Sequence, residues 1–219
     1  GSFGSAGSFS FQESKCMPAG EGGCCILSSA GLYEKLFRLK HIGYFNDQQG
    51  AAASGPPPGL VCRNYRGTEF AAVILEDALD RIEAENRQRD RAADMIRKAL
   101  ADTPGIRFQA RGAKATLQSY YGFGIMLSDE LVERGTNLND FFAALLAEGV
   151  SSSLTYGPVY RHKLWSLPED RFVRTDCPVT EKLWQMQAVT MAHNLLLCED
   201  HDIRKIADAI AKVATAFTV

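Results

Sequence analysis

One lysine near the start of the chain has surroundings that could make it a nucleophile. Lys15 follows residues 8–12, where small polar and aromatic residues alternate, and precedes the glycine-rich string GEGG at residues 20–23. A lysine amine becomes nucleophilic when desolvation or a nearby cation lowers its pKa, and it can then form a Schiff base with a carbonyl. Glycines let the backbone approach a ligand closely. The pattern predicts that Lys15 binds a carbonyl ligand, with Ser10 placed to hydrogen-bond a phosphate of that ligand.

Taken alone, this pattern has a simpler interpretation. A lysine near glycines is most often an ordinary surface lysine. A phosphate-binding loop of a nucleotide-binding protein is a weaker alternative, because the chain contains neither G-x-x-x-x-G-K-[ST] nor G-x-G-x-x-G. The local sequence therefore leaves a covalent ligand site and a surface lysine as the two interpretations.

Two short strands and a helix would position Lys15. The alternation at residues 8–12 and the apolar run at residues 24–27 predict strands on either side of the lysine. Residues 30–42 carry leucines on one helical face and basic residues on the other, which predicts an amphipathic helix. Three consecutive prolines within residues 50–59 then exclude regular structure and predict a stiff loop.

The rest of the chain mixes helical and strand patterns. Helices are predicted at residues 68–100 (as one long helix or two broken ones), 138–148, 179–189 and around 203–213. Strands are predicted at residues 106–109, 119–127 and 151–156. From about residue 76 to the end, these patterns describe an α+β domain.

Composition excludes several classes of function. The 219 residues carry a formal charge of -2, so the chain lacks the basic excess that attracts nucleic acid or an anionic membrane surface. The six cysteines form no CxxC pair, and we interpret them as reduced, mostly structural thiols of a cytoplasmic protein rather than as metal ligands. No apolar run is long enough for a membrane helix, and the first residues do not resemble a signal peptide.

Five strings in fixed order resemble one enzyme family. They are SFSF at residues 8–11 with Lys15 and GEGG after it, LFRLKHIG at 36–43, NYRGTEF at 64–70, YGPVY at 156–160 and CPVTE at 177–181. Together they resemble the DegT/StrS family of sugar aminotransferases, which are fold type I pyridoxal-phosphate enzymes. The resemblance implies an α/β fold, with residues 1–75 as the end of the large cofactor domain and residues 76–219 as the small α+β domain.

The resemblance also assigns roles to individual residues. Lys15 would be the Schiff-base lysine, Ser10 a ligand of the cofactor phosphate, and Asn64 a contact to the cofactor phosphate of the partner subunit in a homodimer. A turn residue before the long helix is the alternative for Asn64. His41 could approach the substrate or be an ordinary surface histidine. His193 receives no role, and Tyr120 and Tyr121 are interpreted as strand packing.

By resemblance, the reaction is amino transfer from glutamine or glutamate to a keto-sugar or keto-cyclitol. The run at residues 38–44 and the YGPVY loop are most similar to glutamine-dependent inosose aminotransferases of aminocyclitol antibiotic pathways. The sequence departs from the family at Cys16, where asparagine or histidine is more usual, and at Gly67, where methionine or alanine is common. Neither change removes a catalytic group.

The family's aspartate for the pyridine nitrogen, its ring-stacking aromatic residue and its first phosphate-binding turn would all precede residue 1. We therefore expect this chain to hold half of a cofactor site. A non-catalytic relative with a regulatory or assembly role is the main alternative function. A small metal-binding module is the other, and it would need regularly spaced thiol and imidazole ligands.

Overall fold

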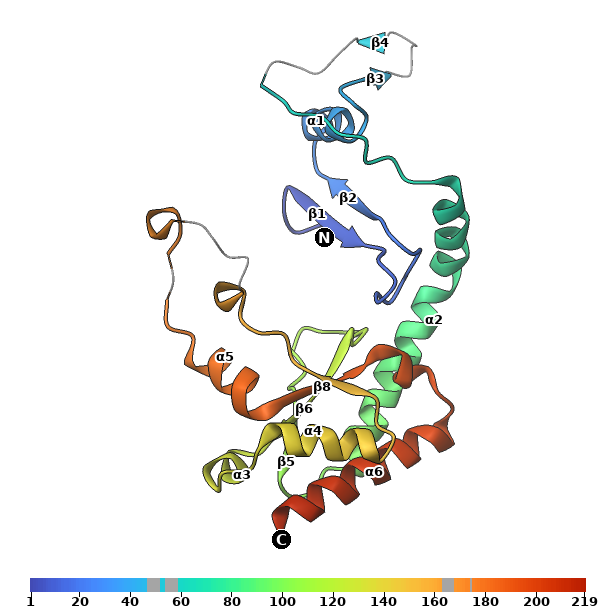
Figure 1. Cartoon of the computed structure of the whole chain (residues 1–219). Coiled ribbons are helices and arrows are strands. Elements are labelled where there is room, and N and C mark those ends of the chain that lie inside the picture. Colours follow the sequence, from blue (N-terminus) through green and yellow to red (C-terminus); the bar gives the residue numbers. More distant parts are fainter. Residues whose placement is uncertain (47–51, 54–58, 163–167, 174) are drawn as a thin grey trace. The chain divides into compact units, whose positions relative to one another are not determined.

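The computed structural model describes residues 1–46, 52–53, 59–162, 168–173 and 175–219 (Figure 1). Contacts divide the chain into unit 1, Gly1–Ile82, and unit 2, Glu83–Val219. Helix α2 (Glu69–Ala99) begins in unit 1 and ends in unit 2. Among the described residues, no helix is long and apolar enough to cross a membrane.

Unit 1 begins with an antiparallel hairpin followed by a helix. Strand β1 (Ala6–Ser10) pairs with β2 (Gly23–Leu27), and Ser10 lies opposite Gly23. Helix α1 (Ala30–Lys40) follows β2 after two serines, and a small antiparallel pair comes next, β3 (Phe45–Asn46) with β4 (Ala52–Ala53). The hairpin and α1 are the elements that position the candidate site.

Helix α1 has defined ends. Ser29 is its N-cap, with Oγ accepting a hydrogen bond from Leu32 N at 3.3 Å. The helix ends in a turn in which Ile42 has φ 60° and Gly43 has φ 92°. A positive φ suits glycine but is rare for a β-branched residue. The conformation of Ile42 therefore marks a turn that is held in place by its surroundings.

Unit 2 is built on a four-stranded antiparallel sheet. Its strands are β5 (Ile106–Phe108), β6 (Gly122–Leu127), β7 (Ser152–Leu154) and β8 (Ala188–Ala192), in the order β5-β6-β8-β7. In β6, Phe123, Ile125 and Leu127 are fully buried while glycines occupy positions 122 and 124. Because alternate residues of a strand face opposite sides, β6 contributes one large apolar face to the core.

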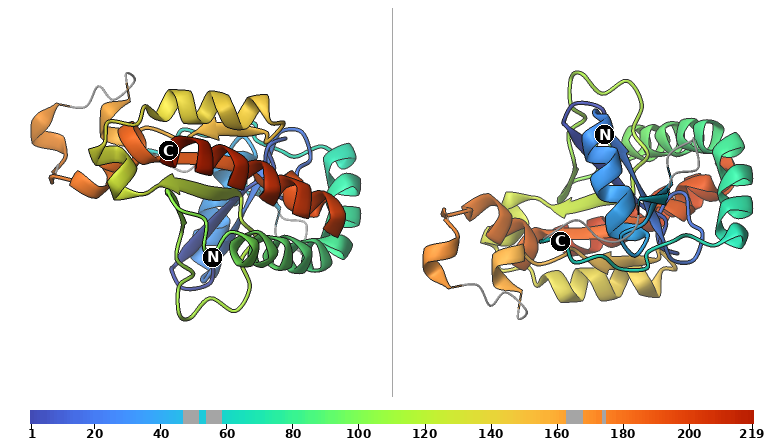
Figure 2. Two further views of the ribbon diagram at one scale, coloured as in Figure 1. Left: turned by 90° about the horizontal axis from the view of Figure 1, so that it is seen from below. Right: turned by 90° about the horizontal axis from the view of Figure 1, so that it is seen from above.

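The other helical segments of unit 2 are α3 (Asp129–Glu133), α4 (Leu138–Ala147), α5 (Pro178–Lys182), α6 (Asp200–Thr218), the 3-10 segments Val159–Arg161, Glu169–Arg171 and His193–Leu197, and a π-helix at Leu183–Gln187. Helices α4 and α6 lie side by side (Figure 2). The core joins the second half of α2, β6, β8, α4 and α6, with Ile96, Phe141 and Ile210 among its fully buried members.

Most of the predicted elements are present, with one error of type. Residues 68–100 form the single helix α2 rather than two broken ones. The predicted helix at residues 179–189 is wrong in its last part, because α5 and the π-helix end at Gln187 and strand β8 begins at Ala188. Of the predicted loop at residues 50–59, Ala52–Ala53 form β4, and the three prolines lie outside the described residues.

The six cysteines are free thiols. Cys24 and Cys25 are exposed and the other four are half-buried, so none of the six lies in the buried core. Cys24 and Cys25 are consecutive in β2, so their side chains face opposite sides of the hairpin.

Candidate active site

Lys15 lies in the loop that joins β1 to β2. Its backbone N–H donates to the carbonyl oxygen of Gln12 at 2.9 Å, which closes a tight turn. The Gln12 side chain stabilises the same turn, because its Oε1 accepts from Ser14 N at 2.9 Å and from Ser14 Oγ at 2.6 Å. Lys15 is half-buried. The backbone at Lys15 is therefore held by local bonds directly after the strand.

Backbone bonds from Phe11 close the base of this loop. Phe11 N donates to Gly22 O at 2.9 Å, and Phe11 O accepts from Ala19 N at 2.8 Å, while the Phe11 ring is buried. Gly22 has φ 140°, a conformation that other residues rarely adopt. At Gly23, a Cβ atom would lie 2.5 Å from the carbonyl oxygen of Phe9, so a side chain there would clash with the opposite strand. The glycine-rich string thus fixes the shape of the lysine loop.

Ser10 is the last residue of β1 and sits at the start of the loop. Its side chain is exposed, and its Oγ accepts a hydrogen bond from Gln12 N at 3.3 Å. This bond uses an oxygen lone pair and leaves the hydroxyl proton for donation. Ser10 therefore retains the donor that a phosphate oxygen requires.

Asn64 is positioned by the end of α1 rather than by the lysine loop. It forms an antiparallel β-bridge with His41, and the next residue, Tyr65, donates its N–H to Lys40 O at 2.9 Å. The Asn64 side chain is exposed, and its Oδ1 accepts from Arg66 Nε at 2.9 Å. Ser10 and Lys15 thus belong to one hairpin, whereas Asn64 lies in a separate segment of the same unit.

His41 is half-buried, and its ring stacks on Phe37 with centroids 5.2 Å apart. Its Nδ1 is buried and has no hydrogen-bond partner among the described residues. His41 therefore packs, half-buried, at the end of α1 beside the segment that carries Asn64. Arg66 was not singled out as a site residue from the sequence, although Arg66 belongs to the NYR string and bonds to Asn64.

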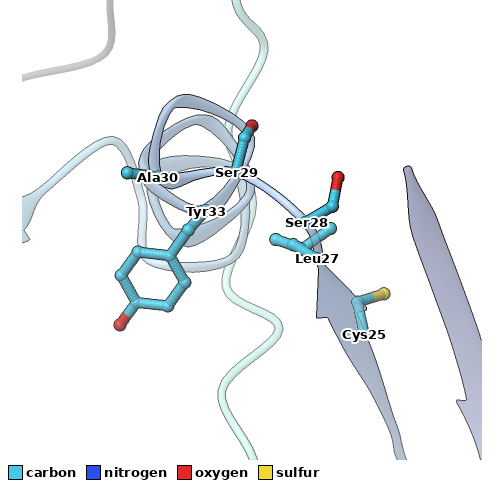
Figure 3. A pocket seen from close by; sticks show the side chains of 6 residues that line it. All are labelled: Cys25, Leu27, Ser28, Ser29, Ala30 and Tyr33. Atoms are coloured by element: carbon cyan, nitrogen blue, oxygen red, sulfur yellow. The ribbon is translucent and has the colours of Figure 1, made fainter. Parts of the chain in front are cut away.

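A pocket of about 340 Å³ opens in unit 1 away from these residues (Figure 3). It is lined by Cys25 and Leu27 of β2, the Ser28–Ser29 link, and Ala30 and Tyr33 of α1. Lys15, Ser10 and Asn64 are not among the lining residues. The pocket therefore does not define the candidate site.

In unit 2, the YGPVY loop at residues 156–160 is joined to α5 by polar contacts. Arg161 Nε donates to Glu181 Oε1 at 2.9 Å, and Gln185 Nε2 donates to Glu181 Oε2 at 2.9 Å. The hydrogen bond from Arg161 lowers the pKa of Glu181. Burial, together with the nearby Glu181 carboxylate, raises the pKa of Tyr160 to about 12. At neutral pH, a neutral Tyr160 of the loop thus lies beside the charged carboxylate of Glu181 in α5.

The two aromatic residues before β6 have different surroundings. Tyr120 is buried, and its hydroxyl oxygen accepts from Arg97 Nη1 at 2.6 Å, which confirms its role in packing. Tyr121 is 39% exposed and stacks on His193 with centroids 6.0 Å apart. Tyr121 is therefore a surface residue beside His193 rather than part of the core.

Comparison with known proteins finds a family whose model matches most of this chain. The model of the DegT/DnrJ/EryC1/StrS aminotransferase family matches residues 1–211. The chain is 31% identical over 236 residues to the L-glutamine:2-deoxy-scyllo-inosose aminotransferase of Streptoalloteichus tenebrarius, a match that covers 97% of this chain and 54% of that protein. It is 28% identical over 227 residues to the L-glutamine:scyllo-inosose aminotransferase of Streptomyces griseus, covering 99% and 53%.

Solved structures show the same fold. The aminotransferase TlmJ from Streptoalloteichus hindustanus superposes with a TM-score of 0.77 at 20% identity, covering 100% of this chain and 54% of that one. PseC of Helicobacter pylori, an aminotransferase of pseudoaminic acid biosynthesis, superposes with a TM-score of 0.78 at 17% identity, covering 98% and 54%. The chain thus spans about half the length of the relatives that it matches.

Proposed function

The chain belongs to the DegT/DnrJ/EryC1/StrS aminotransferase family, and we propose that it forms part of a pyridoxal-phosphate-dependent aminotransferase in which Lys15 binds the cofactor. The observation that carries the proposal is the family match over residues 1–211 together with the position of Lys15 in a glycine-closed loop directly after β1. A covalent cofactor requires an amine on a fixed backbone, and the bonds of Gln12 and Phe11 supply that fixed backbone.

The side chains of unit 1 fit two ends of this cofactor. The Lys15 amine suits the aldehyde, and the Ser10 hydroxyl and Asn64 amide are donors suited to phosphate oxygens. Ser10 keeps its hydroxyl proton available, as its oxygen is the acceptor in the bond to Gln12 N. We propose that the group facing the pyridine nitrogen comes from the half of the family fold that this chain does not span.

In the proposed mechanism, Lys15 has two tasks. Its Nζ first holds the cofactor covalently and, once an amino donor has displaced it, moves a proton on and off the substrate carbon as general base and acid. The bound cofactor supplies an aldehyde for amines and a conjugated ring that takes up electrons. Ser10 and, in the proposed homodimer, Asn64 of the partner subunit would hold the phosphate and so keep the reacting carbon within reach of Nζ.

Glutamine as donor and an inosose as acceptor are the substrates that the relatives support. Both relatives described above are named for glutamine and an inosose. We propose a keto-cyclitol of this class, or a related keto-sugar, as the acceptor, within an aminocyclitol antibiotic pathway. The proposal extends to a cytoplasmic homodimer in which Asn64 contacts the cofactor phosphate of the partner subunit, with residues 1–75 in the large domain and residues 76–219 as the small domain.

Borohydride trapping tests the role of Lys15. The experiment uses the full-length protein, by which we mean a polypeptide that contains this chain and spans the family's length. With pyridoxal phosphate bound, reduction should attach the cofactor to the peptide that carries Lys15. Lys15→Ala should abolish both the label and the turnover, with a loss beyond the roughly hundredfold to ten-thousandfold typical of acid-base catalysis alone.

Lys35→Ala is the control, since Lys35 is an exposed cation on α1. This variant should keep both the label and the turnover. Near-normal turnover of Lys15→Ala, or a label on another lysine, would contradict the proposal. A Lys15 label without any amino transfer would instead indicate a relative that binds the cofactor but has another role.

A further inference from the structure

Asn64 and Arg66 share a side-chain hydrogen bond at the surface of unit 1. Arg66 Nε donates to Asn64 Oδ1 at 2.9 Å, and both residues are exposed. Exposed bonds of this kind contribute little to folding stability, so the main effect of this one is on orientation. We infer that Arg66 is a positioning residue that holds the Asn64 amide with its NH2 group towards a phosphate. The inference rests on the proposed role of Asn64.

The backbone already fixes where Asn64 lies. The bridge to His41 and the bond from Tyr65 N to Lys40 O hold its segment against the end of α1. The adjoining turn contains Ile42 at φ 60°, a strained conformation that persists only where the surrounding structure imposes it. With the Cα atom fixed, the remaining freedom of Asn64 is the rotation of its side chain.

The direction of the amide decides whether Asn64 attracts or repels a phosphate. A carboxamide has an acceptor oxygen at one end and two N–H donors at the other, and the two ends have nearly the same size. A phosphate offers acceptor oxygens and negative charge, so it binds the NH2 end and repels the oxygen. Because Arg66 Nε is a donor without acceptor capacity, its bond selects the oxygen and leaves the NH2 end for the ligand.

The test compares the affinity of the full-length protein for pyridoxal phosphate with its affinity for pyridoxal, which lacks the phosphate. The ratio of the two dissociation constants isolates the phosphate contacts, because both ligands present the same aldehyde to Lys15. Titration by absorbance measures each constant without turnover. A general loss of structure would weaken the binding of both ligands and leave the ratio of the two dissociation constants unchanged.

We expect Arg66→Ala to lower the phosphate preference about tenfold, the usual effect of a hydrogen bond to a charged group. Asn64→Ala should lower the phosphate preference at least as much. The double variant should show the same phosphate preference as Asn64→Ala alone, because Arg66 acts through the amide. Arg63→Ala is the matched control: it removes the same charge from an exposed neighbouring position and should leave the ratio unchanged.

Three results would overturn the inference. The first is an unchanged ratio in Arg66→Ala. The second is an undiminished effect of Arg66→Ala in the Asn64→Ala background, which would show that the guanidinium contacts the phosphate directly. The third is an equal effect of Arg63→Ala, which would show that only the net charge matters. If Asn64→Ala itself left the ratio unchanged, the phosphate role of Asn64 would fail, while the Lys15 labelling would still test the proposed function.

Discussion

The first and second halves of helix α2 bury their apolar side chains to very different extents. In unit 1, Phe70 is 85% exposed and Val73 is 67% exposed, whereas Ile96 and Leu100 of the same helix are buried in the core of unit 2. The contrast holds beyond the helix, because Phe11 and Ala78 are the only hydrophobic side chains found buried among the described residues of unit 1. One continuous helix thus joins a part with a core to a part without one.

This difference bears on where the chemistry lies. Lys15, Ser10 and Asn64 all belong to the unit without a core. The hairpin that carries Lys15 and Ser10 has two strands, and such a hairpin is marginally stable in water without further packing. Stable folds rarely leave so many apolar side chains in water. We propose that the half of the family fold which this chain does not span covers unit 1, and that the cofactor site is rigid only when that half is present.

Hydrogen exchange of the chain alone should show the largest effect. Amides of β6 and β8 should exchange at least about a hundredfold more slowly than those of β1 and β2, since core strands open with energies near that of global unfolding. Mass spectrometry of peptides covering residues 6–10, 23–27, 122–127 and 188–192 measures the difference. Equal protection of β1 and β6 would show that unit 1 is stable by itself. In the full-length protein, the protection of β1 and β2 should rise.

Truncation of one phenylalanine in each unit should give the next largest effect. Phe141→Ala removes a fully buried ring of α4 and should lower the free energy of unfolding by about 3–5 kcal/mol. Phe70→Ala removes an exposed ring and should change it by less than about 0.5 kcal/mol. Urea unfolding followed by circular dichroism measures both variants.

Repeating this pair in the full-length protein sharpens the comparison. If the half of the family fold that this chain does not span covers the first part of α2, Phe70→Ala should now be destabilising by roughly 1–3 kcal/mol, because the ring would be packed. A Phe70→Ala variant that stays neutral there would show that this face of α2 has another use.

Local patterns in the sequence were sufficient to predict much of this fold. The apolar run at residues 24–27 and the helical spacing at residues 30–42 predicted β2 and α1 because their signals lie within the elements themselves. Strand β8 was missed because Ala188–Ala192 follows a helical segment without a turn residue, and it becomes a strand by pairing with β6 and β7, which are distant in the chain. Such nonlocal pairing leaves little trace in a local pattern.

The candidate site likewise has a part set by local sequence and a part set by contacts between distant residues. Lys15 and Ser10 could be proposed as site residues from their spacing, since the strand, the turn and the glycines that hold them lie within one hairpin. The bridge between His41 and Asn64 joins residues 23 positions apart and depends on the turn at Ile42. No local pattern predicts that bridge, and the Arg66 bond could be seen only in the structure.

The smallest expected effect concerns an ion network that links elements of unit 2. Asp129 Oδ1 accepts from Lys182 Nζ at 2.8 Å and from Gln187 Nε2 at 2.7 Å, and Gln187 is buried where the π-helix gives way to β8. The Lys182 hydrogen bond, followed by that of Gln187, lowers the pKa of Asp129. A carboxyl whose pKa is lower in the folded protein stabilises the fold above its unfolded pKa, and this stability is lost as the pH falls through the folded value.

Asp129→Asn should therefore lower the unfolding midpoint slightly at neutral pH and have less effect in acid, where the native carboxyl is also protonated. Thermal unfolding of both proteins between about pH 7 and about pH 3 would show whether their unfolding midpoints converge in acid. The effect should be small because the Asp129 side chain is 57% exposed and water screens its charge. Lys182→Met removes the main cause of the shift, so Asp129→Asn should then change the midpoint less. A difference between wild type and Asp129→Asn that grew towards acid pH would contradict the assignment, because it has the opposite sign.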